Sequence, residues 1–170
     1  MSSVLPSLLD PWRAVDNRSV FVGHLPLSSL PRLRGSLLDV TGEVRFQLGF
    51  SRDEAHRAVL HCKVAATLKL RCQRCLEALD HRVSASTWLA LASGIEEERR
   101  LPEGYDPLPV DDEPIRPRDL IEDELLLALP QIPMHKPVIC ARPVSDANAV
   151  SARSGRANPF AVLADLECEE

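Results

Sequence analysis

The run of residues 60–72 constrains the fold of this chain more than any other feature. Apolar side chains occupy every second position of the run, and mostly polar or basic side chains occupy the positions between them. Successive side chains of a β-strand point to opposite faces, so this pattern predicts one long strand with one buried and one exposed face. The set expected to be buried consists of Leu60, Cys62, Val64, Ala66, Leu68, Leu70 and Cys72.

The runs on either side of this strand predict its neighbours. Residues 44–50 alternate in the same way, and a polar turn separates them from the long strand, which indicates a hairpin. A third strand is expected over about 79–91, entered through the turn 72–75, and a short strand over 19–25. Sequential antiparallel strands of this kind form a meander.

The second half of the chain has a different character. Residues 96–113 are acidic and contain several Pro and Gly residues, so we expect an exposed acidic loop there. A helix should follow this loop. We expect Asp119 as its N-cap, Glu122 three residues later as in a capping box, and Pro130 at its end.

Together these patterns predict an α+β fold: an antiparallel β-meander or partly closed barrel with a packed helix, and a short C-terminal helix on a flexible linker. The expected core domain covers residues 1–140, including the acidic loop at 96–113. Residues 141–157 have the composition of a flexible linker, and residues 158–167 are expected to form the short C-terminal helix. Its apolar stripe, a candidate partner-binding surface, consists of Phe160, Leu163 and Leu166.

The 170 residues are 45% hydrophobic and carry a formal net charge of −5. No apolar run approaches the roughly 20 residues of a membrane-spanning helix, and the first residues do not resemble a secretory signal, so we expect a cytoplasmic protein. The charge is unevenly spread. Residues 1–82 hold 12 Lys or Arg against 8 Asp or Glu, whereas residues 83–170 hold 8 against 17. A local contact between the first half and a nucleic acid is compatible with this distribution.

Five cysteines, an odd number at irregular spacing, favour reduced thiols over a disulfide framework. Cys72 and Cys75 form a Cys-x-x-Cys pair at a turn after a strand, which is the geometry of a zinc knuckle. A tetrahedral zinc ion needs two more ligands, for which His135 and Cys140 are the first candidates. The weaker candidates are Cys62 and His81.

Two other interpretations of the cysteines remain open. The thiols can fill a β-turn and core positions without a metal, which we expect for Cys62 on the apolar face of the long strand. Alternatively, Arg71 and Arg74 would lower the pKa of the neighbouring thiols and favour redox chemistry. The context argues against redox chemistry. A thioredoxin-type pair opens a helix in a βαβ unit, whereas Cys72 and Cys75 follow a long predicted strand. Cys168, near the end of the sequence, is expected to be a free thiol without a role.

The sequence offers little for catalysis. It contains no Gly-x-Ser-x-Gly motif, no Gly-rich phosphate-binding loop, no His-Glu-x-x-His motif and only 7 Gly in all. We therefore expect a protein that is not an enzyme.

The exposed face of the long strand is basic. Lys63, Lys69 and Arg71 lie on it, and Arg74 follows in the turn. Alternate residues of a strand are roughly 6–7 Å apart, comparable to the phosphate spacing of a nucleic-acid strand, so these four residues form a candidate RNA-binding surface. The same residue types also serve solubility and the protection of strand edges. Because Phe46 and Phe50 belong to the core-facing set, we expect no base stacking of the RRM or OB kind.

Three separated motifs in this chain occur together in one known family. They are Leu70-Arg71-Cys72-Gln73-Arg74-Cys75-Leu76-Glu77, then residues 120–130 with the following Pro133-Met134-His135, and finally residues 158–166. On these motifs the chain resembles the YceD family, the large ribosomal RNA subunit accumulation proteins. The motifs stand in the family's order and span most of the chain.

The resemblance implies a bacterial cytoplasmic protein that is needed for the accumulation of large-subunit (23S) ribosomal RNA and has no assigned catalytic activity. We expect it to bind this rRNA or a pre-ribosomal particle. The alternatives are an adaptor that docks ribosomal proteins or assembly factors through its acidic loop and C-terminal helix, or a CxxC redox or metal protein. Some relatives carry a second Cys pair that would complete a zinc site, and this chain has His135 and Cys140 in that region. Zinc is the only cofactor that we expect.

Overall fold

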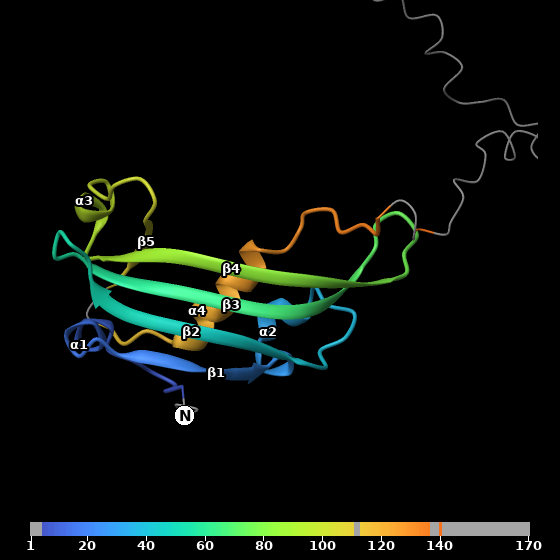
Figure 1. The fold of residues 1–170 in the computed structure, drawn as a ribbon, viewed down its shortest axis with the longest axis horizontal. Coiled ribbons are helices and arrows are strands. Elements are labelled where there is room, and N and C mark those ends of the chain that lie inside the picture. The colour runs from blue at the N-terminus through green and yellow to red at the C-terminus, as the bar shows by residue number, and fades with distance from the viewer. Residues whose placement is uncertain (1–4, 111–112, 137–139, 141–170) are drawn as a thin grey trace, which may run out of the picture.

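The computed structural model describes residues 5–110, 113–136 and 140, which form an open five-stranded sheet with accompanying helices (Figure 1). The strands are β1 (Val20–Pro26), β2 (Glu43–Arg52), β3 (Ala58–Arg71), β4 (Ala78–Ala92) and β5 (Asp106–Pro109). The helices are α1 (Pro11–Asp16), α2 (Pro31–Arg34), α3 (Ile95–Glu98) and α4 (Pro117–Leu127), with a 3-10 turn η1 (Leu27–Ser29).

The strands lie in the sheet in their sequence order, β1-β2-β3-β4-β5. The first four are antiparallel neighbours, which confirms the predicted meander, and each begins and ends within two residues of its expected bounds. The sheet does not close into a barrel. The fifth strand, β5, lies parallel to β4 and was not predicted. Together with the helices, the sheet makes an α+β fold, as expected.

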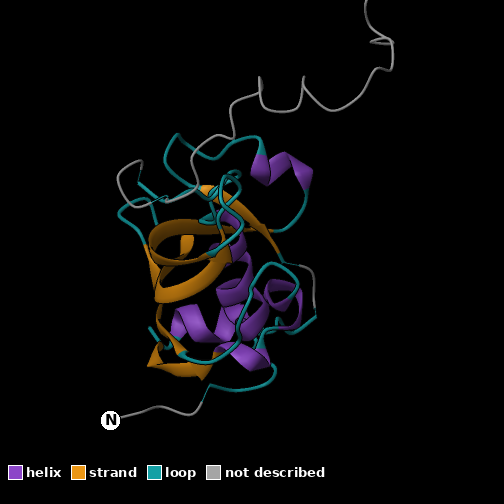
Figure 2. Ribbon diagram, turned by 90° about the vertical axis from the view of Figure 1, so that its right-hand side faces the viewer, coloured by secondary structure: helices purple, strands orange, loops and turns teal. Residues whose placement is uncertain are grey.

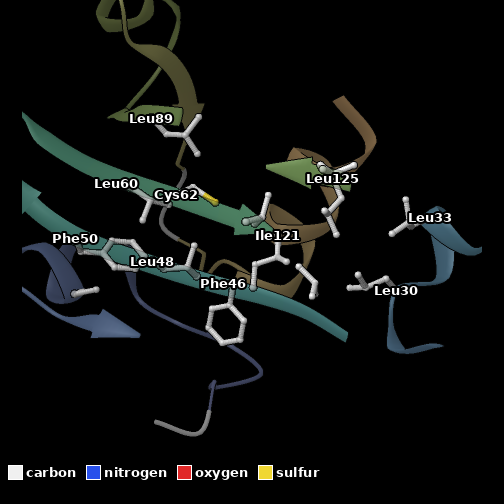
Figure 3. Close-up of a cluster of buried hydrophobic side chains, with 14 of the residues drawn as sticks. Leu30, Leu33, Phe46, Leu48, Phe50, Leu60, Cys62, Leu89, Ile121 and Leu125 are labelled. Carbon is white, nitrogen blue, oxygen red and sulfur yellow. The ribbon is translucent and has the colours of Figure 1, made fainter. Parts of the chain in front are cut away.

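Alternation along β2 and β3 divides the sheet into an inner and an outer face. Phe46, Leu48 and Phe50 of β2 point inward and are buried beside Leu60 and Cys62 of β3 (Figure 3). The residues between them are polar or small and largely exposed. Burial of one apolar face against other elements is the main favourable term in such a fold, so these residues position everything else in the domain.

In the described part of the chain, helices cover the inner face of the sheet. Ile121 and Leu125 of α4 are buried against the apolar side chains of the sheet, and Leu30 and Leu33 lie at its edge (Figure 3). Figure 1 shows α4 crossing behind β3 and β4, and in Figure 2 most of the helical ribbon lies on one side of the sheet. Among the described residues, no helix packs on the outer face of β1 to β4.

The start of α4 differs from the expectation. The helix begins at Pro117 after Arg116, which makes no side-chain cap, and Asp119 lies inside the first turn, so the predicted N-cap was wrong. Glu122 does not form a capping box either. Its side chain, only 1% exposed, accepts hydrogen bonds from the backbone N–H groups of Arg32 (2.6 Å) and Leu33 (2.9 Å). Glu122 therefore caps the neighbouring helix α2 instead of its own.

The segment 96–113, expected to be an acidic loop, contains structure. Most of α3 lies in it, and β5 pairs with β4 through residues such as Leu108, opposite Leu91. Val110 then packs into the core. The predicted linker at 141–157 and helix at 158–167 lie outside the described residues, as do Phe160, Leu163, Leu166 and Cys168.

We predict that Glu122→Ala lowers the free energy of unfolding by about 2–3 kcal/mol, because two backbone N–H groups next to the core lose a charged acceptor. Urea unfolding followed by circular dichroism measures the change. Asp123→Ala is the matched control, since Asp123 binds the same Arg32 side chain at 2.6 Å but is 46% exposed. Asp123→Ala should lower the free energy of unfolding clearly less than Glu122→Ala does. Equal decreases for the two variants would contradict this role of Glu122.

Candidate metal-binding cluster and the open face of the sheet

The connection between β3 and β4 is a tight turn that contains Cys72 and Cys75. The backbone N–H of Cys72 donates to the carbonyl of Glu77 at 2.9 Å, and the N–H of Leu76 donates to the carbonyl of Cys72 at 2.9 Å. Leu76 has a positive φ of 65°, a conformation that lets the chain reverse within the turn. Both cysteines are buried, so the turn folds around its thiols.

The segment that follows α4 returns to this turn (Figure 1). The N–H of Gln73 donates to the carbonyl of Pro133 at 2.8 Å, and the N–H of His135 points at the sulfur of Cys72 at 3.4 Å. The His135 ring also lies 3.0 Å, through Nε2, from the carbonyl of Ala78. If that carbonyl accepts a hydrogen bond from Nε2–H, the other ring nitrogen, Nδ1, carries a free lone pair.

The turn and the returning segment bring four ligand atoms together. One atom each from Cys72, Cys75, His135 and Cys140 lies within 4.8 Å of all the others. The two sulfurs of Cys72 and Cys140 are 3.9 Å apart, and Nδ1 of His135 is 3.3 Å from the sulfur of Cys75. Tetrahedral zinc with Zn–S bonds of about 2.3 Å places two sulfurs about 3.8 Å apart. This cluster of three sulfurs and one nitrogen could therefore hold a metal ion.

The surroundings of the cluster shift the pKa values of two of its thiols in opposite directions. Burial raises the pKa of Cys72, but hydrogen bonds from the backbone N–H groups of Cys75, His135 and Arg74 outweigh it and lower the pKa to about 5. Burial, followed by hydrogen bonding to Cys75 and Cys72, raises the pKa of Cys140 to about 11. One thiolate is thus stabilised by the fold itself, and metals bind cysteine as the thiolate.

The two reserve ligands do not join the cluster. Cys62 is buried in the core, where burial and the nearby Glu124 raise the pKa of its thiol to about 12. This confirms its interpretation as a small buried apolar residue. His81 lies opposite Leu68 in the β3–β4 register and is not among the clustered residues.

The four candidate RNA-binding residues lie in three different environments. Lys63 and Arg71 lie exposed on the outer face of β3, and neither is in an ion pair with a described residue. Lys69 lies on the same face, but its ammonium is 3.5 Å from the carboxylate of Asp39. Arg74 lies in the turn, with its guanidinium 3.9 Å from the sulfur of Met134, next to the cysteine cluster.

Sequence reasoning missed further residues on this face. Arg45 of β2 and Arg82 of β4 share it with Lys63, as the strand register shows. Trp88 of β4 stacks on His61 of β3 at a centroid distance of 4.0 Å and an interplanar angle of 6°. The expectation of a face without aromatic residues was therefore wrong. The sequence could have revealed Trp88, because the alternation of residues 78–92 places it on the outer face of β4.

The comparisons with known proteins agree with this description. A family model described as "Large ribosomal RNA subunit accumulation protein YceD" matches residues 60–167. This chain belongs to the YceD family. A curated relative from Haemophilus influenzae, named large ribosomal RNA subunit accumulation protein YceD, is 32% identical over 171 residues, which cover 96% of each chain. No solved structure matches the chain.

The YceD match spans both halves of the cysteine cluster. Residues 60–167 include most of β3, the turn with Cys72 and Cys75, β4, α4 and the segment with His135 and Cys140. They also include the outer-face residues Lys63 and Trp88. No helix in the described part of the chain is long and apolar enough to cross a membrane.

Proposed function

We propose that this YceD-family protein is a non-catalytic ribosome biogenesis factor, active in the cytoplasm, that promotes accumulation of large-subunit rRNA by binding the rRNA or a pre-ribosomal particle. The observation that carries the proposal is the outer face of β3. It presents Lys63 and Arg71 without carboxylate partners among the described residues, although the chain has a net charge of −5. The names of the family and of the curated relative support the same process.

Electrostatics favours RNA as the contact. Lys and Arg that neutralise phosphates release condensed counterions, so a few exposed cations give a local affinity even on a protein of acidic total charge. On this chain the acidic excess lies in residues 83–170, whereas β3 belongs to the basic half of the sequence. The cations of β3 are therefore a local positive surface and not part of a uniformly basic protein.

We further propose that the cysteine cluster holds a structural zinc ion. The donor set of three sulfurs and one imidazole nitrogen, and the 3.9 Å separation of two sulfurs, fit a tetrahedral ion. Cys72, Cys75, His135 and Cys140 together supply four ligands and leave no position for a substrate, which is typical of structural zinc. The ion would fasten the β3–β4 turn to the segment that follows α4.

We predict that reversing two cations, Lys63→Glu with Arg71→Glu, weakens co-sedimentation with pre-ribosomal particles at least about tenfold, since phosphate contacts become repulsive. The variant should keep its thermal midpoint, because both side chains are exposed. Arg99→Glu with Arg118→Glu gives the same change of net charge away from the sheet and should leave binding unaltered. Unchanged co-sedimentation of the first variant would contradict the proposal.

The same assay tests the adaptor alternative. If the protein docks ribosomal proteins through the segment beyond residue 141, deletion of residues 142–170 should abolish particle binding while cross-linking to RNA persists. If β3 carries the contact, the truncated protein should still bind particles, and the double charge reversal should still weaken that binding.

We predict that the protein purified under reducing conditions contains about one zinc ion per chain, measured by inductively coupled plasma mass spectrometry. Cys75→Ser should lose the ion and lower the thermal midpoint, because the turn loses its attachment. Cys62→Ala is the control, since this cysteine lies in the core and should affect stability without releasing zinc. A reduced protein that neither contains nor takes up zinc would overturn the assignment.

A further inference from the structure

A shallow groove runs across the outer face of the sheet. Two adjoining hollows of about 600 and 480 Å³ share Arg45, Ala65 and Ser84 as lining residues, so they form one continuous depression. Small side chains from the middle of β3 and β4 lie at its centre. Larger cationic side chains stand around them. The groove therefore has small side chains at its base and charged side chains along its sides.

Three cations from three adjacent strands line this groove: Arg45 of β2, Lys63 of β3 and Arg82 of β4. None of them forms an ion pair with a described residue. Glu43 also lines the groove, and its carboxylate lies 3.6 Å from Nδ1 of His24. Cations left without carboxylate partners on an acidic protein indicate an anionic occupant.

An aromatic pair lies next to the groove, two residues along β3 and β4 from the lining residues Lys63 and Ser86. Trp88 is 42% exposed and stacks on His61, which neighbours Lys63 two residues along β3. Burial and the nearby Lys63 both lower the pKa of His61, which favours the neutral ring at pH 7. Tyr105 meets Trp88 edge to face at a centroid distance of 6.5 Å. A partly exposed stack of this kind offers a π-surface next to positive charge.

The strand beside this pair leaves room for a planar group. His61 is flanked in the register by Trp88 on β4 and by Gly49 on β2. A Cβ atom at Gly49 would meet no atom within 4 Å, so the space above β2 next to the aromatic pair is empty. A glycine in a strand interior weakens the strand, and it marks a place where another group can approach closely.

We propose that this groove binds an unpaired segment of RNA, with one base stacking beside the His61–Trp88 pair in the space above Gly49, and with phosphates contacting Arg45, Lys63 and Arg82. The proposal rests on the proposed function and names the form of RNA that is bound. Base faces are available for stacking only where the strand is unpaired, whereas a duplex offers this groove phosphates alone.

The binding test uses the full chain with Trp12→Phe, which leaves Trp88 as the sole tryptophan because the protein has two. Ten-nucleotide oligo(U) and oligo(A), and a ten-base-pair RNA duplex, are titrated while Trp88 fluorescence is recorded. We expect saturable quenching by the single strands, tighter binding of the single strands than of the duplex, and affinity that falls as salt rises.

Gly49→Val tests the stacking position directly, because a Cβ atom there meets no atom within 4 Å and the valine side chain then extends into the space proposed for the base. It should weaken single-strand binding roughly 5- to 150-fold, the range expected for loss of one stacked base, without lowering the thermal midpoint. Trp88→Ala should lose affinity in the same range, now measured by anisotropy of a labelled strand. Gly49→Ala adds a single methyl group and should have a much smaller effect.

Leu127→Ala is the matched surface control, since Leu127 is 82% exposed on α4, which covers the opposite face, and should bind as the parent does. Equal affinity for duplex and single strand, or unchanged binding by Gly49→Val, would overturn the stacking proposal. Neither result affects the proposed function if charge reversal on β3 still weakens particle binding. Binding of an acidic peptide in this groove, with no binding of any oligonucleotide, would likewise overturn the inference.

Discussion

The placement of α4 on the sheet depends on two buried carboxylates of this helix. Glu122 accepts hydrogen bonds from the backbone of α2, and Glu124 accepts one from the hydroxyl of Thr87 on β4 at 2.6 Å. Buried carboxylates are costly unless fully hydrogen-bonded, so these partners specify one rotation and one position of α4 on the sheet. Burial of the apolar side chains of Ile121 and Leu125 stabilises the packing of α4 on the sheet. The two carboxylates determine the position at which the helix packs.

This placement of α4 determines both candidate functional regions. The chain leaving α4 is directed to the β3–β4 turn, where Gln73 bonds to Pro133 and His135 meets Cys72. Because α1, α2 and α4 lie on the inner side, no helix of the described ranges covers the outer side of β2, β3 and β4. A sheet with one covered face buries its core and still presents an ordered row of side chains to a partner.

Strong local periodicity made much of the fold predictable. Alternation within β3 is long enough to identify its buried face and Cys62, and the spacing of Cys72 and Cys75 identifies half of a ligand cluster. Features that depend on tertiary contacts were not predictable. Helices α1 and α2 are too short to show a helical period, and the short strand β5 is defined by its parallel pairing with β4. Glu122 follows the pattern of a capping box, yet its bonds go to α2 because tertiary contact overrides the local motif.

The cysteine cluster and the groove lie on the same pair of strands, and this links the two proposals physically. β3 and β4 stay paired from Val59 opposite Ala90 to Arg71 opposite Ala78, directly before the turn. A metal ion that holds the turn would suppress fraying of the β3–β4 pair at that end. The stacked rings of His61 and Trp88 connect the two strands toward the opposite end. The cations of the groove are thereby held in register before a ligand arrives, so less conformational entropy is lost on binding. A metal at the cluster would thus act on RNA affinity at a distance, by restraining the strands and without touching the ligand.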